Sequence, residues 1–235
     1  MKKVIFISAL AIAAAVSCTK SDIVDTKFDE AISFENYLGR DAMTKSTVIE
    51  TANLESVKVF GYYHGDGNWA GGGSLLWGGG LVLNTPAGVV TQPSGDDERY
   101  WANESDVYSF LAYAPVGHAS LVEAEEFDTA NPVLTYTVNN DFTNADVLVA
   151  EPQTDRTKGD GKVALVFKHK LARLAIKSNV TKGVFDFRIK SVKLTGAFNT
   201  TGTIALVDPT EWDATPTEGT IYTFQDDTKV NEALL

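Results

Sequence analysis

Cys18 is the residue with the clearest chemical potential in this chain of 235 residues. It follows two N-terminal lysines, an apolar run over residues 4–16, and the small residues Ala15 and Ser17. A basic start, a short apolar run and small residues before the junction are typical of a signal peptide. The run is too short for a membrane-spanning helix, which needs about 20 residues. Because the junction resembles a lipobox, we expect cleavage before Cys18 and acylation of its thiol.

Acylation of Cys18 would fix the protein to a membrane of the bacterial envelope. One acyl chain anchors a protein marginally, since each buried CH₂ contributes about 0.8 kcal/mol, so we expect several chains, palmitate among them. Cys18 is the single cysteine, which excludes an intrachain disulfide and a thiolate metal cluster. Residues 1–17 are therefore the predicted leader. Residues 18–27, polar and without periodicity, are the predicted flexible linker.

The remaining reactive side chains form no recognisable catalytic or metal-binding motif. His64, His118 and His169 are the three histidines, and their spacing contains neither HExxH nor H-x-H. Ser74 lacks the following glycine that a nucleophile elbow requires. The glycine-rich segment 65–80 lacks the Gly-Lys-Ser/Thr ending of a P-loop and is instead expected to be a long mobile surface loop. We therefore predict no enzyme, no cofactor and no metal site.

The chain is acidic, which argues against nucleic acid as a partner. Its formal charge is −11, and loss of the two leader lysines leaves 18 basic against 31 acidic residues, or −13. Such a surface repels phosphates. The triplet 96–98 lacks the ligand spacing of a calcium loop and indicates a solvated turn.

Aromatic residues around the glycine-rich segment leave two interpretations open. Exposed, they could stack on sugars; packed inward, they would belong to the hydrophobic core, which is the commoner outcome. The residues concerned are Tyr62, Tyr63, Trp69, Trp77, Tyr100 and Trp101.

Alternating apolar residues predict a chain made mainly of strands. A first strand begins at Phe28, with Ile32 and Phe34 on its apolar side. Further strands are expected at 57–63, 107–113, 134–138, 147–150, 163–167, 174–178, 185–194, 203–207 and 220–224. Turn residues such as those at 159–161 separate them, which indicates an all-β, antiparallel sandwich.

Two stretches are ambiguous. Residues 168–176 have helix-favouring composition beside strand-like neighbours, so a strand and a short helical turn both remain open. The apolar positions between Phe185 and Leu194 change from odd to even numbers, which predicts a β-bulge near Lys190.

Several segments, in this order and spacing, resemble the fimbrillin family of Bacteroidales, the lipoprotein precursors of surface fimbriae. The segments are Ala31-Ile32-Ser33-Phe34, residues 57–63, Tyr100-Trp101, residues 108–115, residues 146–150, residues 165–174, residues 192–196, residues 202–206 and Trp212.

The resemblance implies a fold and an assembly mode. Family members have two transthyretin-like β-sandwich domains, so residues 28–195 would form the N-terminal sandwich and 196–235 its end or the start of an incomplete, C-terminally truncated second domain. Family subunits polymerise by β-strand exchange after an arginine-specific protease trims the first strand. Arg40, in Gly39-Arg40-Asp41, is the matching candidate, and Ile32 and Phe34 belong to the strand that would be exchanged.

The sequence thus predicts a fimbrial (pilus) structural or accessory subunit that is a surface lipoprotein and contributes to adhesion. Its expected partners are other fimbrial subunits, through donor-strand exchange, and the outer membrane, through the lipid anchor. A host or bacterial surface ligand is a further candidate. The alternative is a glycan-binding lipoprotein of the outer membrane, which would lose its ligand on replacement of Trp69, Trp77 or Trp101.

Overall fold

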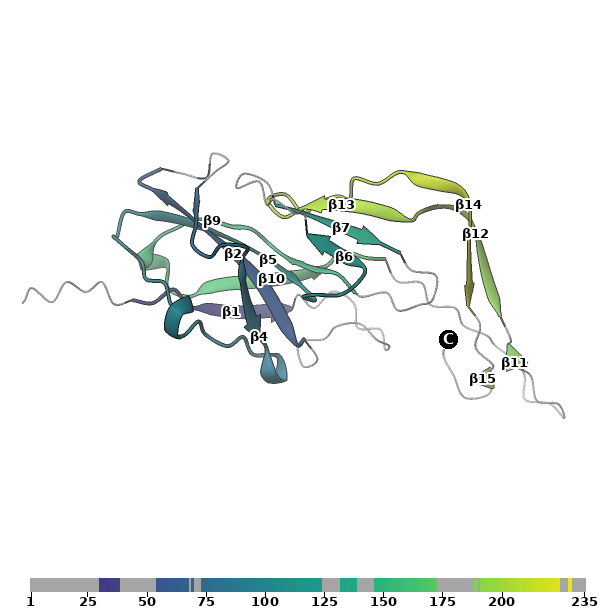
Figure 1. Cartoon of the computed structure of the whole chain (residues 1–235), viewed down its shortest axis with the longest axis horizontal. Helices are drawn as coiled ribbons and strands as arrows, with labels where there is room; N and C mark the ends of the chain where they lie inside the picture. Colours follow the sequence, from purple (N-terminus) through teal and green to yellow (C-terminus); the bar gives the residue numbers. More distant parts are fainter. Residues whose placement is uncertain are drawn as a thin grey trace, which may run out of the picture.

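The structure is a computed structural model, and it describes residues 30–38, 54–67, 69, 73–123, 132–138, 146–172, 188–189, 191–224 and 228–229 (Figure 1). Cys18 and Arg40 lie outside these residues. The described residues contain no α-helix; they form strands, turns and three short 3₁₀ turns. The 3₁₀ turns are η2 (Pro86–Gly88), η3 (Gly95–Asp97) and η4 (Lys158–Asp160).

A large sheet of eight strands forms the body of the molecule. Its order is β1-β10-β8-β5-β2-β3, with β4 also paired to β2 and β9 to β5. The strands are β1 (Phe34–Leu38), β2 (Ser56–Gly65), β3 (Ser74–Leu75), β4 (Leu81–Asn84), β5 (Val107–Ala114), β8 (Leu148–Ala150), β9 (Gln153–Arg156) and β10 (Val163–His169).

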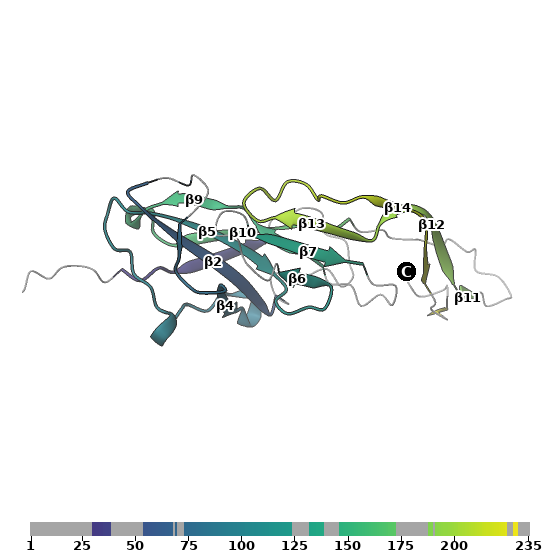
Figure 2. The same ribbon diagram turned by 45° about the horizontal axis from the view of Figure 1, so that its top comes forward.

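A three-stranded sheet covers one face of the large sheet, and a long ribbon reaches away from both (Figures 1 and 2). The small sheet has the order β13-β7-β6, made of Thr201–Ala205, Val133–Thr137 and Leu121–Glu123. The ribbon pairs β12 (Val192–Asn199) with β14 (Pro216–Phe224), and a short pair joins β11 (Arg188–Ile189) to β15 (Thr228–Lys229).

Central strands of the large sheet are buried on both faces, which divides the core into two clusters. Along β5, Phe110 and Ala112 belong to one cluster, and Leu111 and Tyr113 belong to the other. Successive side chains of a strand point to opposite faces, so each central strand contributes to both clusters. The second cluster fills the space under β6, β7 and β13. The first, which contains Phe34, lies on the face away from these three strands.

The all-β sandwich predicted from the sequence is confirmed. Strands found at 56–65, 107–114, 133–137, 148–150 and 163–169 match predicted ones closely. The predicted strand 203–207 is shifted to 201–205, and 220–224 extends back to 216. The domain bounds stay a prediction.

Several expectations need correction or fall on undescribed residues. The predicted strand 174–178 lies outside the described residues, and of the predicted strand 185–194 residues 188–189 are found in β11 and residues 192–194 in β12. The strand expected from Phe28 begins at Phe34, and its pairing with β10 is parallel. Segment 65–80 is not one long loop, because β3 and a turn at 76–80 hydrogen-bond it to β2. Of the ambiguous stretch 168–176, residues 168–172 are described, and Lys168 and His169 belong to strand β10. Lys190 lies outside the described residues, and the ribbon's register shift falls between Gly196 and Phe198.

Candidate functional site at the first strand

β1 is an edge strand held to the large sheet by a parallel ladder. Its five residues pair in register with β10, from Phe34 opposite Val163 to Leu38 opposite Phe167. The ladder begins where the Val163 N–H donates to the Ser33 carbonyl at 2.8 Å. Every other strand pair in the described residues is antiparallel. β1 thus differs from the other described strands in the direction of its pairing.

The residues before β1 pair with a different part of the chain. Ala31 forms an antiparallel bridge with Tyr100. The Ile32 N–H donates to the Arg99 carbonyl at 2.8 Å, and the Trp101 N–H donates to the Glu30 carbonyl at 3.2 Å. Segment 30–38 therefore runs from segment 99–101 to β10 and closes the first core cluster.

Ile32 and Phe34, the two predicted residues of the first strand, are both buried. Each is 1% exposed. The Phe34 ring lies with its centroid 5.6 Å from that of Phe110, edge to face, and 6.2 Å from that of Trp77. Burying a large apolar side chain contributes roughly 1.5–3 kcal/mol, so these two residues supply much of the attachment of the strand.

Two side-chain amides close the outer edge of β1. The Phe34 N–H donates to Gln92 Oε1 at 2.8 Å, and Gln92 Nε2 donates to the Phe34 carbonyl at 2.8 Å. Asn36 Nδ2 donates to the Gly88 carbonyl at 3.0 Å, and Asn36 Oδ1 accepts from the Val90 N–H at 3.0 Å. We call this set of four bonds the amide clasp. It joins β1 to segment 88–92 without a backbone ladder between these two described segments.

Neither residue of the amide clasp, Asn36 or Gln92, is among those that the sequence pattern singles out. One signal for Asn36 was available: it follows Ile32 and Phe34 in the alternation, so it occupies the face that carries the buried residues. A polar side chain there must find hydrogen-bond partners. Gln92 is itself exposed, and nothing in the sequence distinguishes it from a glutamine without such a contact, because its partner lies 58 residues away.

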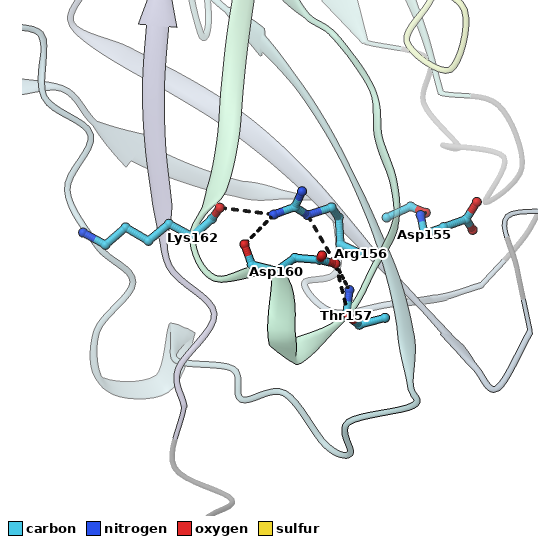
Figure 3. Close-up of polar contacts among 6 residues, drawn as sticks. Asp155, Arg156, Thr157, Asp160 and Lys162 are labelled. Carbon is cyan, nitrogen blue, oxygen red and sulfur yellow. Dashed lines mark hydrogen bonds and ion pairs between the residues drawn. The ribbon is translucent and has the colours of Figure 1, made fainter.

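The turn before β10 fixes where the ladder with β1 begins. Figure 3 shows Arg156 across this turn, where its Nη2 donates to the Asp160 carbonyl at 3.0 Å and contacts the Lys162 carbonyl at 3.4 Å. Asp160 Oδ2 accepts from the Thr157 N–H at 2.7 Å. That hydrogen bond is the main reason that the pKa of Asp160 is lowered; the Thr157 hydroxyl and the Arg156 charge add to it, and burial opposes it.

On the other face of the sheet, a polar cluster ties β2 and β5 to β6. Glu123 forms an ion pair with Lys58 and accepts a hydrogen bond from the Tyr113 hydroxyl. Burial, and then the hydrogen bond to Glu123 and its charge, raise the pKa of Tyr113 above its ordinary value. Tyr113 therefore stays neutral and donates, so the cluster is structural.

The aromatic residues form no sugar-stacking platform of the predicted kind. Trp77 and Trp101 are 4% and 1% exposed, within the first core cluster. Trp69 packs edge to face on buried Tyr62, with ring centroids 5.1 Å apart. Tyr100 is exposed, but its hydroxyl bonds Glu98. The core interpretation therefore holds for most of the set.

The histidines have separate surroundings. The His64 ring packs on Trp69, His118 Nδ1 accepts from the Ser120 N–H, and His169 pairs with Asp146 at 2.8 Å. Within the described segments, no three His, Cys, Asp or Glu side chains gather in a way that could hold a metal ion. No helix in the described part is long and apolar enough to span a membrane.

Solved structures of three proteins from Bacteroides species share this fold. A fimbrial protein from Bacteroides vulgatus aligns with a TM-score of 0.54 at 17% identity, over 85% of this chain and 64% of that one. Two structures described as "putative cell adhesion protein" come from Bacteroides uniformis (TM-score 0.50, 23% identity, 85% and 73% covered) and Bacteroides ovatus (0.56, 13%, 87% and 76%). At these identities the likeness concerns the fold.

Sequence comparison gives the family. No curated protein matches the chain. The model of a fimbrillin-like family matches residues 78–235, which is more than half of the chain and includes β4, β5, β10 and the segment that carries Gln92. The chain therefore belongs to the fimbrillin-like family.

Proposed function

We propose that this protein is a fimbrial structural or accessory subunit that is anchored to the outer membrane through acylated Cys18 and assembles by exchange of β1. The attachment of β1 is the observation that carries the proposal. It is an edge strand with a single ladder, a parallel one, and it completes a core that the rest of the sheet leaves open. Its removal would leave a groove for another strand.

The groove has what strand addition requires. Without β1, the main-chain groups of β10 that now bond it would lose their partners, and Val163, Leu165 and Phe167 would lose apolar cover. An incoming strand that restores the ladder and fills the Phe34 pocket would satisfy both needs. Burial of side chains would supply most of the affinity, and the ladder would supply direction.

Arg40 is placed suitably in the sequence for releasing β1. It follows the last residue of the strand, Leu38, by two positions. Cleavage after Arg40 would separate residues 18–40, with the acylated Cys18, from the remaining chain. The groove would then open only after export, and the cut subunit would leave its anchor and join other fimbrial subunits at the cell surface.

Mass spectrometry of the envelope-purified protein, before and after treatment with an arginine-specific protease, tests this proposal. We expect an acylated Cys18 start, followed by a start at Asp41 and ladders of higher oligomers. Arg40→Lys is the matched control, because it keeps the charge and resists this protease. An unacylated start would contradict the anchor, and oligomers that form equally in Arg40→Lys would contradict release of β1 as the trigger.

A further inference from the structure

Alternate residues of the first strand face the core, and each meets a different kind of contact. Ile32 and Phe34 fill apolar positions and are 1% exposed. Asn36, next in the alternation, bonds to segment 88–90. Tyr37 is on the opposite face and is 51% exposed. The strand therefore presents a pattern of apolar, aromatic and amide side chains to its surroundings.

The contact at Asn36 is specific for a primary amide. Its Nδ2 donates to the Gly88 carbonyl while its Oδ1 accepts from the Val90 N–H, both at 3.0 Å. An aspartate has the same shape but lacks the donor when ionised, and it would place a negative charge beside a carbonyl oxygen. An apolar side chain would satisfy neither backbone group. Segment 88–90 thus distinguishes asparagine from its closest analogues.

Gln92 bonds the main chain of the strand, so its contact does not depend on which side chains the strand carries. Its amide bonds both the N–H and the carbonyl of Phe34, at 2.8 Å each. A strand that slipped by two residues would keep this contact with Gln92. The slip would, however, move the aromatic ring out of its pocket beside Trp77 and Phe110, and it would move the asparagine away from Val90. Gln92 and the two side-chain contacts therefore agree in one register only.

We propose that the groove now occupied by β1 selects the strand that it accepts: the strand must carry an apolar residue, an aromatic residue and an asparagine at alternate positions, and these side chains set its register while Gln92 bonds its main chain. This inference rests on the proposed exchange of β1. It adds the chemical identity of the partner segment, namely an extended strand with the pattern shown by Ile32, Phe34 and Asn36.

The test uses the full chain with a specific protease site inserted within residues 41–47, cut after folding so that β1 stays bound without a covalent link. Fluorescent peptides of residues 30–38 then compete for the groove, and incorporation is followed by anisotropy. We expect Phe34→Ala to weaken the peptide on the order of a hundredfold. Asn36→Asp should weaken it about tenfold. Tyr37→Ser is the control and should bind as the parent peptide does.

A Gln92→Ala chain separates the two kinds of contact. Because Gln92 contacts main chain, its loss should weaken all four peptides by a similar factor and leave their order unchanged. Equal binding of the parent and Asn36→Asp peptides would overturn the proposed selection while leaving strand exchange intact. Failure of every peptide to incorporate, the parent included, would contradict strand exchange itself and the inference with it.

Discussion

β1 and β5 belong to the same sheet and contribute to the same core cluster, yet they are held very differently. β5 pairs with β2 along most of its length and with β8 and β9 on its other side, and seven of its eight residues are buried. β1 has one ladder, and the amide clasp replaces a second. β1 thus combines buried key side chains with a main chain that is bonded to few neighbours, which is what the proposed exchange of this strand requires.

Hydrogen exchange should show the largest difference between the two strands. Amides at residues 110–113 of β5 should exchange only through global unfolding, whose free energy for a domain is about 5–15 kcal/mol. The main-chain groups of Ser33, Glu35 and Tyr37 are directed toward β10. The amides of Glu35 and Tyr37 should exchange faster than those of β5, because local opening of β1 is enough to expose them. Equal protection in both strands would mean that β1 does not open separately.

Truncation of one aromatic residue in each strand gives the next largest effect. Phe110→Ala should lower the free energy of unfolding by about 3–5 kcal/mol, as is typical for a buried phenylalanine. Phe34→Ala should lower the free energy of unfolding less. Once β1 detaches from the sheet, the loss cannot exceed the free energy with which β1 was attached. Urea denaturation measures both, and a larger loss for Phe34→Ala would reverse the comparison.

Removal of the Gln92 amide should affect β1 alone. Gln92→Leu leaves the Phe34 N–H and carbonyl without their side-chain partners, which costs about 1–3 kcal/mol for a buried group. We expect faster exchange of β1 amides with unchanged protection in β5. Gln153→Leu is the matched control, since its amide makes one 3.4 Å contact with the Glu151 carbonyl. A drop in β5 protection would show that the clasp supports the whole sheet.

The smallest effect concerns pH and the turn before β10. The pKa of Asp160 is lowered in the folded protein, so its contribution to stability is present above the unfolded pKa of about 3.9 and is lost as pH falls below it. Asp160→Asn should therefore lower the Tm slightly at pH 6, and the difference from the parent should shrink toward pH 3. A difference that grew on acidification would contradict the assigned role of the carboxylate.

Most strand positions could be predicted from the sequence, because alternation over β7 and β10 reflects burial on one face, and apolar and aromatic runs over β2 and β5 reflect burial on both faces. The direction of β1 could not, since an alternating pattern is the same in parallel and antiparallel ladders. The glycine-rich context of Trp77 predicts a mobile loop, yet its indole packs beside Phe34, as the core interpretation of the aromatic residues expects, and donates to the Asp97 carbonyl. The pairing of Gln92 with Phe34 depends on tertiary contacts over 58 residues, which local pattern does not contain.

The bonds between Gln92 and Phe34 also bear on colloidal behaviour. An open edge strand can recruit strands from other molecules and start uncontrolled aggregation. At Phe34 both main-chain groups are already occupied by a side chain of the same molecule. A second molecule cannot pair there without first displacing that amide, so the folded monomer carries its own protection against untimely self-association at this edge.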